Sequence, residues 1–299
     1  MMTSMDFQLL RAGITEVFMQ TFRKPSFYER IFNVRNSQQE YEEFLSIVGL
    51  PNLIEWNSDG GELPMVKAIQ GTRVVFVHRD YGYMWSLSKR LLRGNQYLNL
   101  SAELTRSAAQ SAQYTVEALA TAVIASGFTV NGADGVPLFS TDHPLMNGST
   151  YSNRIGAALS KASLQDAITR FRRAVNHRGQ PITIEPRYLI VPPELEFTAK
   201  ELINSSVVVA QSNTSGYSTN YTNVLQGIAE VVVNPYLIDT NDWFLFADKS
   251  DHKLMLFWRE KPNITTERDF RTQGISSAIN MALSVGYADW LGLVGSTVA

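Results

Sequence analysis

Ser140, Asp142 and His143 are the residue types of a hydrolytic triad, and they lie within four positions of one another. A serine hydrolase would use the histidine to deprotonate the serine and the aspartate to orient the histidine. Side chains from one tight loop rarely converge in that geometry, the sequence has no Gly-X-Ser-X-Gly turn, and an aspartate before His-Pro is typical of turn capping. The sequence therefore favours a structural loop here and keeps a cytosolic hydrolase as an alternative.

The other chemistry-bearing residues do not form a metal, cofactor or thiol site. The chain has no cysteine, which excludes a disulfide scaffold, a cysteine-based zinc site, an iron–sulfur cluster and a thiol nucleophile, and indicates a reducing compartment. None of the four histidines lies three or four residues from another, and no glycine-rich phosphate loop is present. We therefore predict no catalytic residue, no cofactor and no metal. The histidines are His78, His143, His177 and His252.

The charge balance argues against a nucleic-acid-binding protein. Lys and Arg total 26 and Asp and Glu total 28, so the net charge of −2 provides no general basic field. Basic and aromatic residues alternate at Arg79, Tyr81, Tyr83, Trp85 and Lys89, and such a strip can stack single-stranded nucleic acid. A β-ribbon that packs on a neighbour produces the same pattern, and the near-neutral charge favours packing. Nucleic-acid binding stays an alternative that requires salt-sensitive binding by the free subunit.

The first half of the chain is predicted to contain a few long helices and strands, which must position the residues discussed above. Apolar residues at helical spacing predict a helix over 7–18, and a capping pattern predicts a second helix over 38–48. Residues 63–92 are rich in β-branched and aromatic residues and predict a two-stranded ribbon that turns near Gly71. The clearest helix covers 101–126, with Ser101 as its N-cap and an apolar stripe along one face.

The second half alternates helices and strands. A helix capped near Ser163 is followed by a buried strand over 187–191, and Pro192-Pro193 opens another helix. Residues 211–224 predict a polar loop, and four further strands are predicted over 228–233, 243–247, 253–258 and 275–285. The sequence has no signal-peptide core and no unbroken run of about 18 apolar residues, so no membrane contact is predicted. The mixture of predicted helices and strands is that of an α+β protein. The predicted two-stranded ribbon would not be stable alone, which indicates self-assembly.

Short motifs in this order resemble the major capsid proteins of tailed double-stranded DNA bacteriophages, which share the Hong Kong ninety-seven-type fold, and among them the Mu-like major head subunits. The similarity extends over nearly the whole chain, and the order and spacing of the motifs carry it. The motifs are Asp134-Gly135, Leu138-Phe139-Ser140 and Asp142-His143-Pro144 after the long helix, then Pro186 to Leu195, Trp243 to Asp248, and Gly286-Tyr287-Ala288-Asp289-Trp290.

The resemblance implies a division of the chain into the parts of that fold. The long helix of 101–126 becomes the spine helix of the peripheral domain, and the ribbon becomes an extended loop. The implied parts are an N-terminal arm and following helix (1–56), the extended loop (57–86), the spine helix and peripheral domain (87–150), the axial domain (151–256) and closing strands of the peripheral domain (257–299).

The resemblance also implies partners and a location. Such subunits form hexamers and pentamers of one chain in an icosahedral shell around a double-stranded DNA genome, with a portal protein. The arm begins almost at once, so we expect a separate scaffolding protein. We expect a virion capsid protein, assembled in the host bacterial cytoplasm, that makes weak, non-specific contact with packaged DNA through arm residues such as Arg11. A bacterial nanocompartment (encapsulin-like) shell, which holds cargo protein instead of DNA, is the nearest alternative.

Charged residues of the arm and ribbon are the predicted subunit-interface residues. Their mixed signs suit pairing between copies of one chain. They are Asp59, Glu62, Lys67, Arg73, Arg79, Asp80, Arg23 and Lys24.

Overall fold

The chain folds into two compact units, each made of segments that are distant in the sequence. In this computed structural model, unit 1 comprises Met1–Glu42, Val75–Thr121 and Met255–Gly286, and unit 2 comprises Glu43–Val74, Ala122–Leu254 and Tyr287–Ala299. The structure describes residues 4–22, 26–56, 60–67, 69–92, 97–211 and 218–298.

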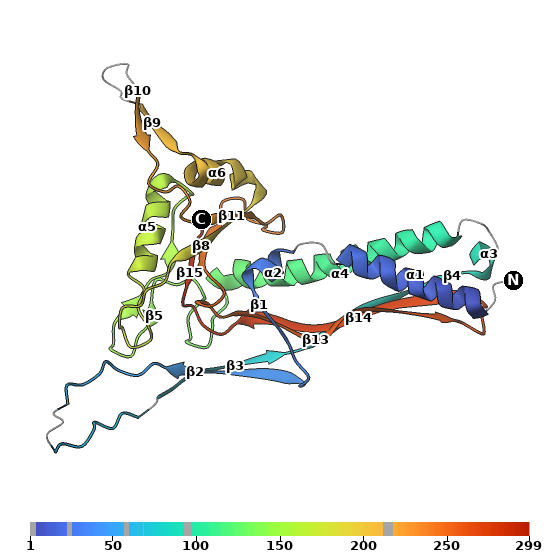
Figure 1. Ribbon diagram of the computed structural model, residues 1–299, viewed down its shortest axis with the longest axis horizontal. Helices are drawn as coiled ribbons and strands as arrows, with labels where there is room; N and C mark the ends of the chain where they lie inside the picture. Colours follow the sequence, from blue (N-terminus) through green and yellow to red (C-terminus); the bar gives the residue numbers. More distant parts are fainter. Residues whose placement is uncertain are drawn as a thin grey trace. The chain divides into compact units, whose positions relative to one another are not determined.

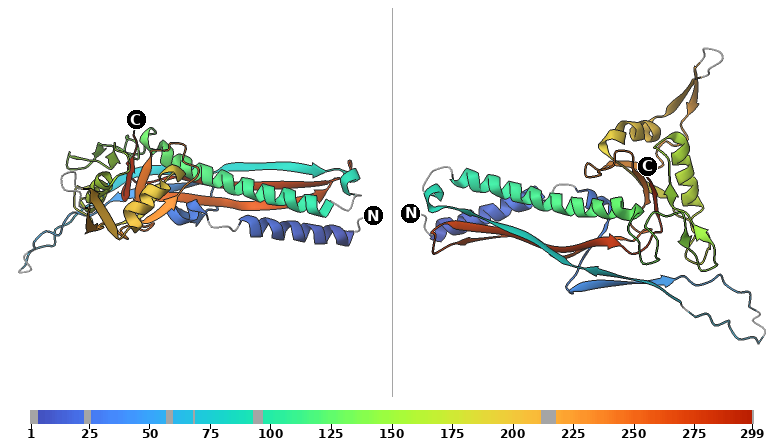
Figure 2. Two further views of the ribbon diagram at one scale, coloured as in Figure 1. Left: turned by 90° about the horizontal axis from the view of Figure 1, so that it is seen from above. Right: turned by 180° about the vertical axis from the view of Figure 1, so that it is seen from behind.

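Unit 1 combines a four-stranded sheet with helices that run along it (Figures 1 and 2). The strand order is β1-β13-β14-β4, with β1 parallel to β13 and β14 antiparallel to β4. The strands are β1 (Asn33–Asn36), β4 (Arg79–Leu87), β13 (Leu254–Arg268) and β14 (Ile275–Tyr287). The helices are α1 (Ser4–Phe22), α2 (Phe27–Ile31), α3 (Lys89–Leu92) and α4 (Tyr97–Ala125), the last of which continues into unit 2.

The long helix α4 confirms the predicted helix over 101–126 and part of its predicted buried face. Ala108, Ala112 and Val116 of the predicted stripe are buried, whereas the other three residues of that stripe are half-buried. The predicted N-cap is wrong, because the helix begins at Tyr97 and Ser101 lies buried inside it. With 29 residues, α4 is about 44 Å long at ~1.5 Å per residue.

A helix over 38–48 was the wrong prediction for the segment that follows β1. The structure has strand β2 (Tyr41–Val48), which pairs with β3 (Ile69–Val77) in a two-stranded ribbon. The exposure of side chains alternates along β2, as it does in a strand with one covered face: Tyr41 and Leu45 are exposed, whereas Ser46 is buried.

The pairing of the ribbon also differs from the prediction. Residues 63–92 do not pair with each other: β3 pairs with β2, and β4 pairs with β14 in the sheet of unit 1. Gly71 lies inside β3 instead of in a turn, and a Cβ atom there would be 2.8 Å from the Ser46 hydroxyl oxygen. Glycine is therefore required by the close approach of β2.

Unit 2 is built on a five-stranded sheet with the order β11-β8-β12-β15-β7. Its core is continuous: every residue of β12 is buried, and Leu164 and Phe171 of α5 pack against the same cluster. The sheet strands are β7 (Arg154–Ile155), β8 (Pro186–Val191), β11 (Glu230–Val233), β12 (Trp243–Ala247) and β15 (Leu293–Ser296). The other elements are β5 (His143–Pro144), β6 (Thr150–Tyr151), α5 (Lys161–Arg172), α6 (Glu196–Asn204), β9 (Val207–Gln211), β10 (Ser218–Thr222) and the 3-10 turns Ser126–Phe128 and Pro193–Leu195.

Most predicted elements of this unit are confirmed, with local corrections. The helix α5 has Ser160 as its N-cap, and Ser163 completes a capping box from the third helical position. The predicted polar loop over 211–224 is in part a strand, because residues 218–222 form β10, which pairs antiparallel with β9. Residues 212–217 lie outside the described residues. Within the described ranges no helix is long and apolar enough to cross a membrane.

Candidate functional site

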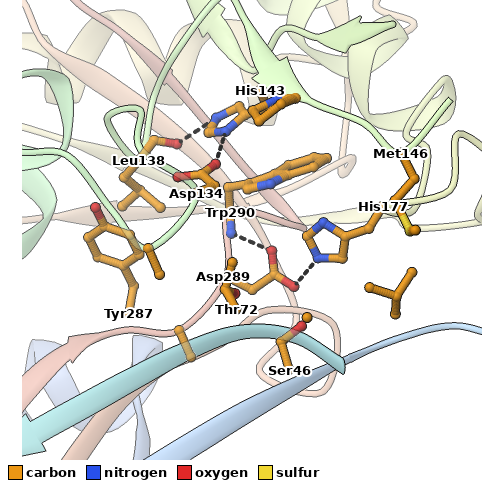
Figure 3. Close-up of a pocket in the computed structure, with 15 residues that line it drawn as sticks. Ser46, Thr72, Asp134, Leu138, His143, Met146, His177, Tyr287, Asp289 and Trp290 are labelled. Carbon is orange, nitrogen blue, oxygen red and sulfur yellow. Dashed lines mark hydrogen bonds and ion pairs between the residues drawn. The ribbon is translucent and has the colours of Figure 1, made fainter. Parts of the chain in front are cut away.

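Two of the motifs singled out in the sequence meet around one indole ring in unit 2. Asp134 and His143 come from the loop after α4, and Asp289 and Trp290 come from the segment after β14. Together with His177 they line a cavity of about 360 Å³ (Figure 3). We call these five residues the His–Asp–Trp cluster.

The imidazole of His143 is completely buried and hydrogen-bonded on both sides. Its Nδ1 atom lies 2.7 Å from Oδ2 of Asp134, and its Nε2 atom lies 3.2 Å from the Leu138 carbonyl oxygen and 3.0 Å from Oδ1 of Asn153. The ring is thus held by one side-chain carboxylate, one backbone carbonyl and one side-chain amide. The ring therefore ties three backbone segments together.

This geometry rules against the hydrolytic triad. The Ser140 hydroxyl accepts the backbone N–H of Asp142 at 3.1 Å, and the Asp142 carboxylate accepts the Thr141 hydroxyl at 2.6 Å. The carboxylate on His143 is that of Asp134, and Nε2 faces acceptors instead of a serine. The hydrolase alternative is wrong.

Asn153 is a central residue of this site that the sequence did not indicate. Its Nδ2 group donates to the carbonyl oxygens of Leu138 at 2.8 Å and Leu293 at 3.1 Å, and its Oδ1 atom accepts the Ser140 N–H at 2.9 Å. The side chain is fully buried. Nothing in the local sequence marks it, because one of its partners lies 140 positions away.

Trp290 is held between ring systems. His143 stacks on it with a centroid distance of 4.6 Å, and His177 meets it edge-on at 5.5 Å (Figure 3). Tyr151 also stacks on the indole, with a centroid distance of 5.0 Å. The indole therefore fixes the positions of both histidines by packing.

His177 is held by the second aspartate of the cluster. Its Nε2 atom lies 2.9 Å from Oδ2 of Asp289, while Oδ1 of Asp289 accepts the backbone N–H of Trp290 at 2.7 Å. The hydrogen bond to Asp289 raises the pKa of His177, partial burial opposes this, and the charges of Asp289 and Asp134 add to the increase. Among the described residues no group of three potential ligands could hold a metal ion.

Comparison with known proteins identifies the family. The family model described as "Phage capsid protein" matches residues 72–296, about three quarters of the chain. The chain belongs to the phage capsid protein family. The match includes all five residues of the His–Asp–Trp cluster. No protein of curated function matches the chain by sequence.

Solved structures agree on the fold. The subunit of the bacteriophage JBD30 procapsid is 16% identical, with a TM-score of 0.52 over 99% of this chain and 76% of that one. The capsid of cyanophage P-SCSP1u gives 12% identity and a TM-score of 0.59 over 93% and 89%. A virus-like particle from Pyrococcus furiosus gives 10% identity and 0.53 over 97% and 98%.

The predicted α+β capsid fold and the shell role are therefore confirmed: this is a structural protein of a phage capsid and not an enzyme. The nanocompartment alternative is not better supported, since the virus-like particle is no more similar than the phage capsids.

The structure places the charged residues predicted for the capsid interface on exposed surfaces. Glu62 and Lys67 lie between β2 and β3, and Arg79 and Asp80 lie at the start of β4. Arg73 forms an ion pair with Glu43 across the ribbon, with Nε and Oε1 2.6 Å apart. Asp59, Arg23 and Lys24 lie outside the described residues.

The sequence reasoning concentrated on these charges and overlooked the apolar residues beside them. The described residues between β2 and β3 include seven exposed large apolar side chains, of which Leu53 is 102% and Met65 93% exposed. The signal was visible, since these apolar residues lack helix or strand periodicity. We call residues 50–56 and 60–67 the apolar loop. Its exposed apolar residues are Leu50, Leu53, Ile54, Trp56, Leu63, Met65 and Val66.

Proposed function

We propose that this subunit builds an icosahedral phage head from hexamers and pentamers, and that the apolar loop contacts a neighbouring copy of the chain. The observation that carries the proposal is the set of seven exposed apolar side chains in one loop of unit 2. An exposed apolar surface of this kind marks a protein interaction site.

In this proposal, the apolar residues of the loop stabilise the contact between chains and not the single subunit. Leu53 and Met65 are fully exposed, so folding of the single subunit gains almost nothing from them. Burying each against a neighbour would contribute roughly 1.5–3 kcal/mol. Glu62 and Lys67, of opposite sign, lie on either side of Met65 in the sequence and suit pairing with a second copy.

A substitution in the loop tests this better than a deletion of residues 57–84, because residues 79–84 belong to β4 in the sheet of unit 1. The Leu53→Ser/Met65→Ser double variant should keep the melting temperature of the free subunit and fail to form shells in electron micrographs. Ile238→Ser is the matched control, since Ile238 is 93% exposed and lies outside the loop. Normal shells from the double variant at the wild-type concentration would refute the interface.

Contact with the packaged genome is proposed to be weak and non-specific. The net charge of −2 leaves no broad cationic surface, and Arg11 of α1 is an exposed basic residue of the arm. Each neutralised phosphate adds about 0.9 to the slope of log affinity against log salt. A slope below about 3 for isolated capsomers fits a handful of contacts, and a steep slope would contradict the proposal.

The finer parts of the assignment rest on the family resemblance and stay proposals. They are the similarity to Mu-like head subunits, a separate scaffolding protein, a portal protein, and assembly in the host bacterial cytoplasm. The division into arm, extended loop, peripheral and axial domains is also proposed. The arrangement of α5, β8, β11 and β12 in unit 2 supports the range 151–256 as the axial domain. Co-purification of the subunit with a scaffolding protein from infected cells would test the partner.

A further inference from the structure

A short turn of unit 2 contacts the chain at the point where it leaves β2 and enters the apolar loop. Arg178 donates a hydrogen bond from Nε to the carbonyl oxygen of Gly49, and Nε2 of Gln180 lies 2.8 Å from Oδ1 of Asn52. Gly49 directly follows β2, and Asn52 lies within the apolar loop. The direction in which the loop departs is therefore set partly by these two side chains.

The turn itself is internally fixed. The backbone N–H of Asn176 donates to the carbonyl oxygen of Gln180 at 2.9 Å. Oδ1 of Asn176 accepts the backbone N–H groups of Arg178 at 2.9 Å and Gln180 at 3.0 Å. Gly179 has a φ of +81°, which side chains other than glycine rarely adopt. The backbone at Arg178 and Gln180 is consequently fixed within the turn.

His177 connects this turn to the His–Asp–Trp cluster. Its side chain bonds Asp289 at 2.9 Å, and its carbonyl oxygen accepts the N–H of Met146 at 2.9 Å. The ribbon lines the other side of the same cavity through Ser46, Val48, Gly71 and Thr72 (Figure 3). The turn thus lies between the anchored cluster and the base of the apolar loop.

We propose that residues 176–180 act as a positioning element for assembly, in which the His177–Asp289 pair anchors the turn that directs the apolar loop toward a neighbouring subunit. This inference rests on the proposed function, because the loop is taken to be the contact between copies. His177, Arg178 and Gln180 act through the loop and do not contact the neighbour themselves.

The anchor depends on pH in a defined direction. The titratable groups that line the cavity with His177 are Asp289 and Asp134, His143 on the stacked face of Trp290, and Tyr287, and the ribbon contributes no titratable side chain to the cavity. Burial raises the pKa of Tyr287 to about 12, so it does not titrate between pH 6 and 9. Folding raises the pKa of His177, so its interaction stabilises the turn fully below the ordinary histidine pKa near 6.5. That stabilisation is lost as pH rises through the pKa of the folded state. The loop should therefore be held at pH 6 and released at alkaline pH.

Hydrogen–deuterium exchange of the unassembled full-length subunit tests this, with rates corrected for the intrinsic effect of pH. At pH 6, Arg178→Ala/Gln180→Ala and His177→Gln should each speed exchange in residues 49–56 about fivefold, the effect of losing roughly one hydrogen bond. The wild type should approach this rate as pH rises to 9, whereas His177→Gln should show no such pH dependence. Arg173→Ala, at an exposed residue outside the turn, is the control and should leave exchange unchanged.

Unchanged exchange in both turn variants, or an equal pH profile in wild type and His177→Gln, would overturn the positioning role. A uniform rise in exchange across unit 2 would also overturn it, since that result shows general destabilisation. Because no shells are needed for this measurement, its outcome is separate from the Leu53→Ser/Met65→Ser test of the loop as an interface.

Discussion

Replacing Asn153 with alanine should destabilise unit 2 more than any substitution of an exposed residue in the same loop. The Asn153 side chain is fully buried, and its amide makes hydrogen bonds to the carbonyl oxygens of Leu138 and Leu293, to the N–H of Ser140 and to the ring of His143. Alanine removes all four bonds and leaves buried polar groups with fewer partners.

The magnitude follows from the number of bonds. A net loss of about 1 kcal/mol for each of the four hydrogen bonds gives about 4 kcal/mol. At roughly 2–4 °C per kcal/mol for a chain of this size, the melting temperature of the free subunit should fall by about 8–15 °C. Differential scanning calorimetry of the unassembled subunit measures this directly.

Two further variants separate the hydrogen-bond network from general effects. Asn153→Asp keeps the oxygen acceptor and loses the donor, so its melting temperature should lie between those of wild type and Asn153→Ala. Asn147→Ala, at an exposed residue of the same loop, should cost less than about 1 kcal/mol. If Asn153→Ala melts no lower than Asn147→Ala, the network does not hold this loop.

Two predictions concern unit 1. Val116→Asp places an unpaired charge at a fully buried position of α4 and should lower the free energy of unfolding, measured in urea, by several kcal/mol. Gln110→Glu, at an exposed position of the same helix, should leave it unchanged. Equal stability of the two variants would contradict the assigned buried face. Burial raises the pKa of Glu117 to about 7, although it accepts the backbone N–H groups of Phe27 and Tyr28. Stability should therefore fall as pH rises from about 4.5, the ordinary pKa, to about 7, and calorimetry should find a weaker fall in Glu117→Gln; an identical pH slope would show that Glu117 does not titrate there.

The elements that sequence patterns predicted well are those whose partners lie within the subunit. The stripe of Ala108, Ala112 and Val116 identifies α4 because its apolar face is covered in the folded chain. The strand β12 is apolar at every position because both of its faces are buried. In these places local pattern and tertiary packing require the same residues.

The strand β2 shows why the segment over 38–48 was mispredicted as a helix. Tyr41, Phe44, Leu45 and Val48 have the spacing of an amphipathic helix, and this spacing suggested one. In the structure Tyr41 and Leu45 lie on the exposed face of the ribbon. Apolar residues on both faces remove the alternation that identifies a strand, so the rule for half-buried strands fails.

The candidate site was predictable as a set of motifs but not as a set of contacts. The sequence drew attention to His143 and to the segment that contains Trp290, yet the carboxylate that it set beside His143, in the disfavoured triad, was Asp142 instead of Asp134. The contact of His177 with Asp289 spans 112 positions, and no local spacing encodes such a pair. Only the fold brings these segments together.

The mispredicted strand and the unexplained apolar loop have one physical cause. Secondary-structure patterns assume that apolar residues are buried in their own chain, whereas β2 and the loop after it keep Leu45, Leu53 and Met65 exposed. In the proposed shell a neighbouring copy covers the apolar loop, so its sequence is suited to the assembled state. Such a surface is useful only if it is presented in one direction, and the turn at Arg178 and Gln180 is placed to supply that direction. In the proposed shell, the departures from single-chain patterns therefore mark the segment that contacts a neighbouring copy.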